Sequence, residues 1–406
     1  MKRCLVCDSA IEPFISFGRM PLADAFLTPE QFASEYFYNL EVASCGNCRM
    51  VQLSEQVDRE KMFHEEYAYY SSTSNRMIEH FAGFARFVSA EVLSGRDPFV
   101  VEIGSNDGIM LRNFAAAGIR HLGVEPSANV AEVATGTGIR TICEFFDETT
   151  ADDILSQDGQ ADAILGANVM CHIPYLHSVL EGVKLLLKPG GLLIFEDPYL
   201  GDIIEKTAFD QIYDEHTFYF SAGSVSNLVE MHGLELVGLA PQNVHGGSMR
   251  YLIAHRGTRP RSEAVAAQVA REEALGLTRP ESFERFRRKT EQARDELMAL
   301  LGRLKGEGRR VVGYGATAKS ATVTNFCGIT PELVEFVSDT TPIKQGKFTP
   351  GAHLPVRPYS EFTASYPDYA LLFAWNHAAE IMEKERAFRD AGGKWIVYVP
   401  EVAVLD

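Results

Sequence analysis

Short apolar segments alternate with helical ones through the middle of the chain, and this alternation limits the fold more than any other feature. Four segments are predicted to be buried strands separated by helices, and they cover residues 98–103, 121–126, 161–168 and 192–198. Strands that alternate with helices form a parallel, doubly wound sheet. A helix at 77–93 should precede this sheet, and strands at 234–241 and 248–256 should complete it.

The length and the charge of the chain limit its domain number and its partners. A chain of 406 residues is expected to form two to three domains of about 100–200 residues each. Its 38 Lys and Arg against 55 Asp and Glu give a net charge of −17, which argues against broad electrostatic binding of nucleic acid. No apolar run reaches the roughly 18 residues of a membrane span, and no signal peptide is recognisable. We therefore expect a cytoplasmic protein with no membrane or nucleic-acid partner.

Four of the seven cysteines form two Cys-x-x-Cys pairs near the N-terminus, namely Cys4/Cys7 and Cys45/Cys48. Each pair can place two thiolates on one side of a tight turn, and two such turns make the tetrahedral sulfur cage of a structural zinc site. The alternatives are a redox-active pair or four unrelated thiols, and two pairs in one short stretch favour zinc. With four protein ligands the metal would stabilise the fold and leave no position for water.

A second α/β unit is predicted at the C-terminal end. Residues 258–310 are charged and helical, which indicates a connecting helix pair with a solvated face. A strand, a glycine turn, a helix and further strands follow from residue 309 onward. We predict an α/β protein of three domains: a small zinc-binding module over 1–66, a larger doubly wound domain over 67–257, and the connector with a smaller Rossmann-like domain over 258–406.

The first strand of the middle domain runs into the glycine loop Gly104-Ser105-Asn106-Asp107-Gly108. Gly104 allows the chain to turn sharply off the strand, and Gly108 allows a ligand close to the backbone where the helix starts. Glu125 ends the next strand, where a carboxylate can accept both hydroxyls of a ribose, and Asn168 ends the following one. The loop contains no Lys or Arg, so a ligand with an ammonium group and no phosphate suits it better than NAD does.

The loop, the acidic strand end and the turn Lys188-Pro189-Gly190-Gly191, in this order, resemble the core of class I S-adenosylmethionine methyltransferases. The alternative is a Rossmann-like scaffold without a ligand. The resemblance implies S-adenosylmethionine as cofactor, held by Glu102, Gly104, Ser105, Asn106, Asp107, Gly108, Glu125, Pro126, Asn168 and Ser72.

The C-terminal domain has a glycine loop of its own, Gly313-Tyr314-Gly315-Ala316-Thr317-Ala318-Lys319-Ser320. It differs from a P-loop by Ala318, and it also fits a Gly-x-Gly-x-x-Ala dinucleotide loop with Asp339 at the end of the next strand. Both motifs bind a pyrophosphate through backbone amides at a helix N-terminus, and Lys319 adds a cation. We expect a pyrophosphate site here, with further nucleotide contacts from Asn325, Trp375, Asn376 and His377, although core packing would equally explain Trp375.

An acid–base group is expected in the run Tyr213-Asp214-Glu215-His216, because a His beside a carboxylate and a Tyr can exchange protons near neutral pH. A run with Tyr67 and Tyr70 joins the first two domains, and these phenols can donate hydrogen bonds to a developing oxyanion. His172 and His245 are further candidates for substrate contact, with a structural role as the alternative.

The whole chain resembles the nucleotide-sugar C-3 methyltransferases of deoxysugar and antibiotic biosynthesis. The motifs are the cysteine quartet, FHEEYAYYSSTS, VEIGSNDGIML, FDQIYDEHTF, VHGG, VVGYGATAKSATVTNFCGI and LLFAWNH. The resemblance implies a dTDP-linked 4-keto-deoxysugar as substrate. It implies His216 as general base, supported by Glu215, Tyr213, Tyr67 and Tyr70, and a nucleotide-holding loop with Gly315, Ala316, Thr317 and Lys319.

Carbon acidity suggests the reaction. We expect His216, oriented by Glu215, to remove the proton at C-3 beside the C-4 ketone, and the resulting enolate carbon to take the methyl group. An O- or N-methyltransferase shares the cofactor site and is the first alternative. An NAD-dependent nucleotide-sugar oxidoreductase using the Gly313 loop, and a zinc-stabilised nucleic-acid adaptor, are weaker alternatives. The sequence leaves open the oligomeric state and whether the sugar carries a 3-amino or a 3-hydroxy group.

Overall fold

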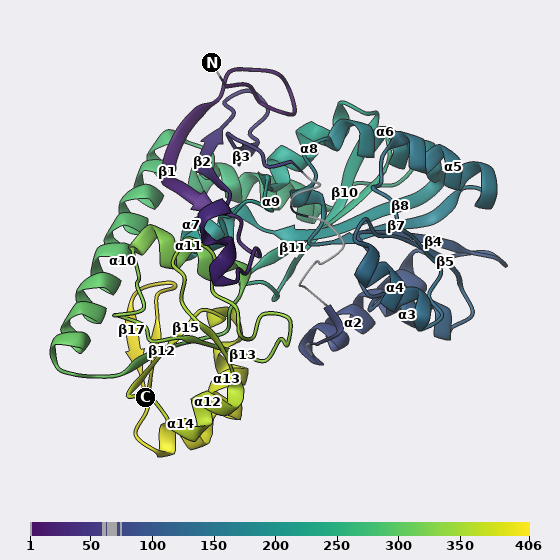
Figure 1. The fold of residues 1–406 in the computed structure, drawn as a ribbon. Coiled ribbons are helices and arrows are strands. Elements are labelled where there is room, and N and C mark those ends of the chain that lie inside the picture. The colour runs from purple at the N-terminus through teal and green to yellow at the C-terminus, as the bar shows by residue number, and fades with distance from the viewer. Residues whose placement is uncertain (1, 59–61, 63–70, 74) are drawn as a thin grey trace.

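Three β-sheets organise the chain in the computed structural model, which describes residues 2–58, 62, 71–73 and 75–406. In Figure 1 a small sheet near the N-terminus lies above a six-stranded sheet and to the left of a seven-stranded sheet. The predicted α/β class, with a small N-terminal unit and two α/β units, is confirmed. No helix among the described residues is both long enough and apolar enough to cross a membrane.

The N-terminal sheet is antiparallel and has the strand order β1-β2-β3-β9. Its strands are β1 (Glu12–Pro21), β2 (Phe37–Ser44), β3 (Val51–Leu53) and β9 (Phe218–Tyr219), and the short helix η1 (Pro29–Ser34) lies between β1 and β2. The strand β9 comes from the middle of the chain, so this sheet extends beyond residues 1–66. Because β9 begins two residues after His216, the pairing of Val51 with Tyr219 ties the N-terminal module to the candidate base.

The seven-stranded sheet has the order β10-β11-β8-β7-β4-β5-β6. Its strands are β4 (Phe99–Ile103), β5 (Arg120–Val124), β6 (Thr141–Ile142), β7 (Ala161–Ala167), β8 (Leu187–Pro198), β10 (Leu234–Gln242) and β11 (Ser248–His255). The strands β4 to β8 are parallel, as predicted. The strand β11, by contrast, runs antiparallel to both of its neighbours, β8 and β10. The short connection from β10 to β11 can only form a hairpin, which makes that pair antiparallel.

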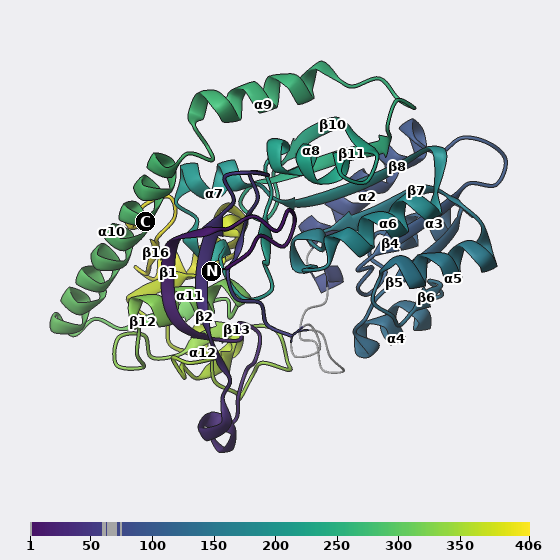
Figure 2. The same ribbon diagram turned by 90° about the horizontal axis from the view of Figure 1, so that it is seen from above.

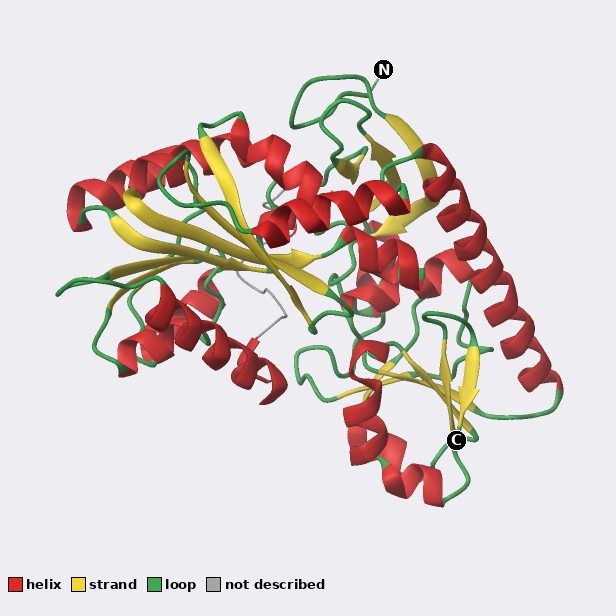
Figure 3. Ribbon diagram, turned by 180° about the vertical axis from the view of Figure 1, so that it is seen from behind, coloured by secondary structure: helices red, strands yellow, loops and turns green. Residues whose placement is uncertain are grey.

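Helices cover both faces of this sheet (Figures 1 and 3). One face packs on α2 (Asn75–Glu91), α3 (Leu111–Ala116) and α4 (Ala128–Gly136), and the other on α5 (Glu148–Asp158), α6 (Leu176–Leu186) and α8 (Ala222–Glu230). Successive strand residues point to opposite faces of the sheet. Val100 therefore packs in the core on the α2 side, while Phe99 and Val101 pack in the core on the α6 side. The central strands therefore carry apolar residues on both faces, as the sequence pattern indicated.

The prediction of a turn at residues 188–191 is wrong. These residues lie inside β8, where the partner on β7 advances from Ala161 to Ala163 while β8 advances from Leu187 to Leu192. The segment is thus an irregularity within the strand. Lys188 Nζ lies 2.7 Å from a carboxylate oxygen of Asp162 on β7, which fixes the bulge to its neighbour.

The C-terminal unit follows the helix pair α9 (Glu263–Leu275) and α10 (Pro280–Gly306), which Figure 2 shows along the top and the left edge of the molecule. Its sheet has the order β14-β13-β12-β15-β16-β17. The strands are β12 (Val311–Tyr314), β13 (Val337–Asp339), β14 (Val356–Pro358), β15 (Tyr369–Leu372), β16 (Lys394–Val397) and β17 (Ala403–Leu405), of which β17 is antiparallel. The helices are α11 (Ala318–Cys327), α12 (Tyr359–Ala364), η5 (Trp375–His377), α13 (Ala378–Lys384) and α14 (Arg386–Asp390).

Short helices complete the middle domain and place site residues at its carboxyl edge. They are η2 (Ser71–Thr73), η3 (Met170–His172), α7 (Leu200–Lys206) and η4 (Phe209–Gln211). The helix η3 follows β7, and α7 and then η4 follow β8, at the edge where ligands bind in open α/β folds.

Candidate active site

The four paired cysteines meet at one point. Their sulfur atoms all lie within 4.8 Å of one another, with 3.5 Å between Cys4 and Cys48 and 3.4 Å between Cys7 and Cys45. A tetrahedral zinc–thiolate centre has sulfur atoms about 3.8 Å apart, given zinc–sulfur bonds of about 2.3 Å. Each Cys-x-x-Cys turn closes on a left-handed residue just after its second cysteine, Asp8 and Arg49. The two turns therefore form matching knuckles that fit a zinc ion.

The glycine loop after β4 turns through three left-handed residues, Gly104, Asn106 and Gly108, with φ values of 64°, 48° and 79°. A Cβ on Gly104 would lie 2.5 Å from the Val169 side chain, so this position requires glycine. A Cβ on Gly108 would meet Ile139 at 3.0 Å. The backbone angle of Gly108 and the packed isoleucine both favour glycine there, and the close approach of a ligand expected at Gly108 stays a prediction.

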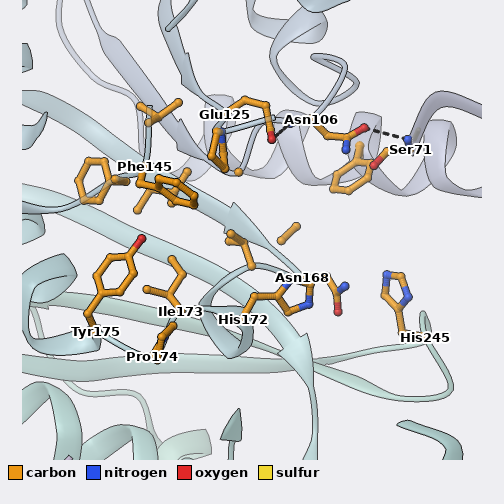
Figure 4. A pocket seen from close by; sticks show the side chains of 18 of the residues that line it. Ser71, Asn106, Glu125, Phe145, Asn168, His172, Ile173, Pro174, Tyr175 and His245 are labelled. Carbon is orange, nitrogen blue, oxygen red and sulfur yellow. Dashed lines mark hydrogen bonds between the residues drawn. The ribbon is translucent and has the colours of Figure 1, made fainter. Parts of the chain in front are cut away.

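An open pocket of about 880 Å³, counting the solvent at its mouth, lies beside this loop (Figure 4). Six residues from η2, the glycine loop and the strand ends line it: Ser71, Gly104, Asn106, Glu125, Pro126 and Asn168. Its other end is apolar and aromatic, with Phe145, Phe146, Ile173, Pro174 and Tyr175. Sequence reasoning missed this second set, because these residues follow strand ends without forming a motif.

This pocket is called the donor pocket below, after the methyl donor. The remaining residues predicted to bind S-adenosylmethionine do not line it. Glu102, Ser105, Asp107 and Gly108 are buried outside its lining, and the backbone amide of Ser72 donates to the Asp107 carboxylate at 3.0 Å. Burial, together with the Glu125 and Asp107 carboxylates, raises the pKa of Glu102 well above its usual value. These buried residues pack within and around the glycine loop.

The pocket residues fit S-adenosylmethionine. Glu125 accepts the backbone amides of Asn106 and Ser127, each at 2.9 Å, and its oxygens keep further lone pairs for ribose hydroxyls. The side-chain oxygen of Asn168 is buried without a hydrogen-bond partner among the described residues. A buried acceptor in a polar pocket needs a donor, and an amino group of a ligand would supply one. The aromatic end offers flat apolar contacts for a purine.

The ring of His216 is buried and held at both nitrogens. Its Nδ1 lies 2.8 Å from the Gln211 carbonyl oxygen, and its Nε2 lies 2.8 Å from the Tyr213 hydroxyl. A carbonyl only accepts, so Nδ1 carries the hydrogen in the neutral ring, and Nε2 accepts from Tyr213. Burial, and then the nearby His172 and Lys319, lower the pKa of His216 well below 6.5. The imidazole is thus neutral at pH 7, with its lone pair at Nε2.

The orienting bond expected from Glu215 comes instead from the main chain of Gln211, which sequence reasoning missed. Glu215 is itself buried. The ring of His172 lies 5.1 Å from that of His216, centroid to centroid, and lines the donor pocket. The candidate base therefore lies next to a residue that lines the pocket. Tyr67 and Tyr70 lie outside the described residues.

His245 lies at the end of the pocket beside Asn168 (Figure 4). Burial lowers the pKa of His245 to about 3, and the Lys319 ammonium and His377 act in the same direction. Burial likewise lowers the pKa of His172 to about 3, with His245 adding to the effect. Two neutral imidazoles, His172 and His245, thus line the pocket, and the neutral ring of His216 lies next to His172.

The predicted anion cradle at Gly315, Ala316 and Thr317 needs correction. The amide of Gly315 donates to the Ser338 carbonyl at 2.9 Å, that of Ala316 to the Asp339 carboxylate at 2.7 Å, and that of Thr317 to the Gly315 carbonyl at 3.0 Å. Asp339 also accepts the Thr341 amide at 2.7 Å, so its carboxylate closes the loop on itself. These three amides are already paired, which removes the basis for both the P-loop and the dinucleotide interpretations of residues 315–317.

Of the other residues predicted to bind the nucleotide, Asn325 forms one group, and Lys319, Trp375, Asn376 and His377 form the second. Asn325 donates to the carbonyls of Ala321 and Pro350 and is thus engaged within its domain. Lys319 donates to the Asn376 side chain at 2.7 Å, and its ammonium lies 5.1 Å from the centre of the Trp375 ring.

The second group meets the middle domain at one place. Trp375 donates through its indole N–H to Asp210 at 2.6 Å, and its ring packs where a Cβ on Gly246 would clash at 2.6 Å. His377 is half-buried, and burial lowers its pKa with help from Lys319 and Arg76. The structure thus brings Lys319, Trp375, Asn376 and His377 to the loop that contains His245.

Comparison with known proteins agrees with this architecture. Family models match a zinc binding domain over residues 4–63, a methyltransferase domain over 76–239 and a C-methyltransferase C-terminal domain over 243–400. The C-methyltransferase NovU of Streptomyces niveus is 36% identical over 99% of this chain and 96% of its own length.

More distant matches cover only part of the chain. An uncharacterized methyltransferase of Mycobacterium leprae is 28% identical over 23% of this chain and 35% of its own length. A SAM-dependent methyltransferase from Anabaena variabilis is 18% identical, with a TM-score of 0.34 over 44% of this chain and 85% of that one. Matches of this size say nothing about substrate. The NovU match and the three family models, by contrast, span almost the whole chain, which therefore belongs to the C-methyltransferase family, with S-adenosylmethionine as methyl donor and structural zinc in its N-terminal domain.

Proposed function

We propose that this C-methyltransferase transfers a methyl group to C-3 of a dTDP-linked 4-keto-deoxysugar. The observation that carries the proposal is the neutral His216 ring, fixed in one tautomer beside the donor pocket. A saturated carbon has no lone pair with which to attack a methyl group, so carbon methylation needs a base and an acidic C–H bond. The C–H bond next to a ketone provides that acidity.

The proton moves first in the proposed reaction. His216 Nε2 takes the proton from C-3, and the electron pair of that C–H bond passes toward the C-4 oxygen, which becomes an enolate. The electron pair then returns to form the carbon–carbon bond at C-3 and restores the ketone. The bound donor supplies an electrophilic methyl group on a sulfonium, whose thioether leaves neutral.

Tyr213 supports this step as a hydrogen-bond donor. Burial, and then the Glu215 carboxylate, raise the pKa of Tyr213 well above 10, so its hydroxyl keeps its proton. Without substrate this hydroxyl donates to Nε2 of His216 at 2.8 Å. When the C-3 hydrogen of the sugar takes its place beside Nε2, the hydroxyl is released to donate to the C-4 oxygen, where negative charge develops. Tyr67 and Tyr70 are proposed to assist, as the family resemblance implies.

The nucleotide end of the substrate is proposed to lie against the C-terminal domain. Lys319 supports this assignment, because it is a half-buried ammonium whose hydrogen-bond partner, the Asn376 side chain, is neutral. Trp375 and His377 lie on the same short helix, η5, and complete the proposed contacts together with Asn376. The helix η5 and the His245 loop face each other, so a diphosphate-linked sugar here would point its ring toward His216.

The test is incubation of the purified protein with S-adenosylmethionine and a panel of dTDP-4-keto-deoxysugars that differ at C-3 in amino and hydroxy groups. Mass spectrometry should show one added methyl group on at least one member, and NMR should place it on a ring carbon. A methyl group on oxygen or nitrogen, or no turnover of any member, would contradict the proposal. The best substrate of the panel also decides between the amino and hydroxy sugars.

A further inference from the structure

Gln211 lies between the candidate base and the loop at the end of the donor pocket. It is the last residue of η4, is 3% exposed, and forms hydrogen bonds with both His216 and His245. Its main-chain carbonyl oxygen lies 2.8 Å from His216 Nδ1, and its side-chain Nε2 donates to the carbonyl oxygen of His245 at 2.5 Å. One residue thus holds both histidines through different atoms.

The loop that Gln211 holds has an uncommon backbone. His245, Gly246 and Gly247 are all left-handed, with φ values of 52°, 86° and 130°. A residue with a side chain adopts this region less readily than glycine does, so contacts from outside the loop help to hold His245 in this conformation. At Gly247, a Cβ would lie 2.4 Å from Asp202, which leaves no room for an alternative residue.

Each carbonyl of the loop has its own donor. Gln211 Nε2 donates to His245, Lys206 Nζ donates to Gly246 at 2.6 Å, and the Tyr199 amide donates to Gly247 at 3.1 Å. Of these three donors, the Gln211 side chain is the one whose own main chain also contacts the base. A displacement of Gln211 therefore moves the His245 end of the donor pocket and the His216 ring together.

We propose that Gln211 is a positioning residue that fixes His216 relative to the bound methyl donor. It contacts His216 and the His245 loop and acts through them. This inference rests on the proposed function, because the benefit of the arrangement is alignment of the base, the C-3 carbon and the methyl group. Misplacement of reacting groups by about 1 Å can lower a rate by about 100-fold.

The test compares Gln211→Met, which removes the donor and keeps the side-chain length, with Gln211→Glu, which presents an acceptor to the His245 carbonyl. The matched control is Gln160→Met, because the Gln160 amide also donates to main-chain carbonyls, of Leu185 and Leu187, far from the cleft. For each protein the measurements are kcat and KM with the substrate found in the panel, and S-adenosylhomocysteine affinity by calorimetry. Histidine ¹⁵N chemical shifts report the tautomer of His216, and circular dichroism reports folding.

We expect Gln211→Met to lower kcat by about 10- to 100-fold, with KM for the sugar nearly unchanged, and the control to behave as wild type. The His216 signal should change from one Nδ1–H tautomer to a mixture. Folded Gln211 variants with wild-type kcat and an unchanged His216 signal would overturn the inference. If Gln211→Met does not fold, Gln211→Glu decides by the same criteria.

The tautomer measurement separates the two hypotheses. If no dTDP-4-keto sugar is methylated by the wild type, the proposed function fails, while a changed His216 signal and donor affinity in Gln211→Met would still support the positioning role. If the wild type is active and both Gln211 variants match it, the proposed function stands and the positioning role fails.

Discussion

The Nε2 atom of His216 lies 2.8 Å from the hydroxyl oxygen of Tyr213, while Nδ1 of the same ring lies 2.8 Å from a main-chain carbonyl. The carbonyl fixes which nitrogen carries hydrogen, and burial keeps the ring neutral. The lone pair of the ring is therefore directed to the Tyr213 hydroxyl before any substrate binds. This pair is the part of the site whose removal has the clearest expected effect.

Replacing His216 by Asn should remove the base and leave the donor pocket intact. An amide takes up no proton near neutral pH, so we expect turnover to fall by about 10²- to 10⁴-fold, the range for a lost general base. Calorimetry should give an S-adenosylhomocysteine affinity close to that of the wild type, because His216 does not line the donor pocket. Wild-type turnover in His216→Asn would exclude His216 as the base.

Removing zinc should unfold the N-terminal module and also lower turnover. The metal holds the two cysteine turns together, and a structural zinc site contributes directly to folding. The strand β3 pairs with β9, which begins two residues after His216, so the disturbance should reach the base. Amide exchange after treatment with a strong chelator should show loss of protection in β1 to β3.

The variant Cys45→Ser should reproduce the effect of the chelator, and the exposed Cys143→Ser should serve as its control. Metal analysis should find zinc in the wild type and in Cys143→Ser, and less in Cys45→Ser. Metal-free protein with fully protected β1 and β2 amides would show that zinc is not structural here.

The sequence predicted the parts of the site that depend on repeated local patterns. Alternating strands and helices placed Glu125 and Asn168 at the ends of β5 and β7, the two strands that flank β4, and both residues line the pocket. The partner of His216 was predicted wrongly, since Glu215 is the acidic neighbour in the sequence but the Gln211 carbonyl makes the contact. Every residue has a carbonyl, so no residue type marks such a partner.

The glycine loop at residues 315–317 shows a second limit of sequence reasoning. Its pattern matches anion-binding loops, but Asp339 accepts the Ala316 amide and thereby uses a donor that an anion would need. Whether an amide is free depends on tertiary contacts and not on the glycine spacing. The aromatic lining by Phe145 and Tyr175 was missed for a related reason, because two segments far apart in sequence form it.

Glu272 should stabilise the contact between the connector and the middle domain. Its carboxylate on α9 is 6% exposed and accepts the Tyr199 hydroxyl and the amides of Ala222 and Gly223 at the start of α8. Glu272→Ala leaves these buried donors without their acceptor, so the free energy of unfolding should fall by about 2–4 kcal/mol in urea denaturation. Glu273→Ala on the same helix breaks only an exposed pair with Arg49 and should cost about 0.5 kcal/mol or less. Equal losses in the two variants would contradict this role.

Acid should destabilise the protein partly through His172. Its pKa falls from 6.5 to about 3 on folding because the ring is buried, so below pH 6.5 the unfolded chain binds a proton that the folded chain does not. The stability contribution of His172 therefore decreases as pH falls, by about 1.4 kcal/mol per pH unit within this window. Urea denaturation at pH 7, 6 and 5 should give a steeper acid loss for wild type than for His172→Gln. Parallel curves would show that His172 titrates normally in the folded protein.

The central claim is that this enzyme ionises a C–H bond before it forms the carbon–carbon bond. The most direct measurement is hydrogen–deuterium exchange at C-3 of the dTDP-4-keto sugar in D₂O, with S-adenosylhomocysteine in place of the methyl donor. We predict that the wild type catalyses this exchange and that His216→Asn does not. A wild type that methylates C-3 but catalyses no exchange, or a His216→Asn variant that exchanges as fast as wild type, would contradict the account.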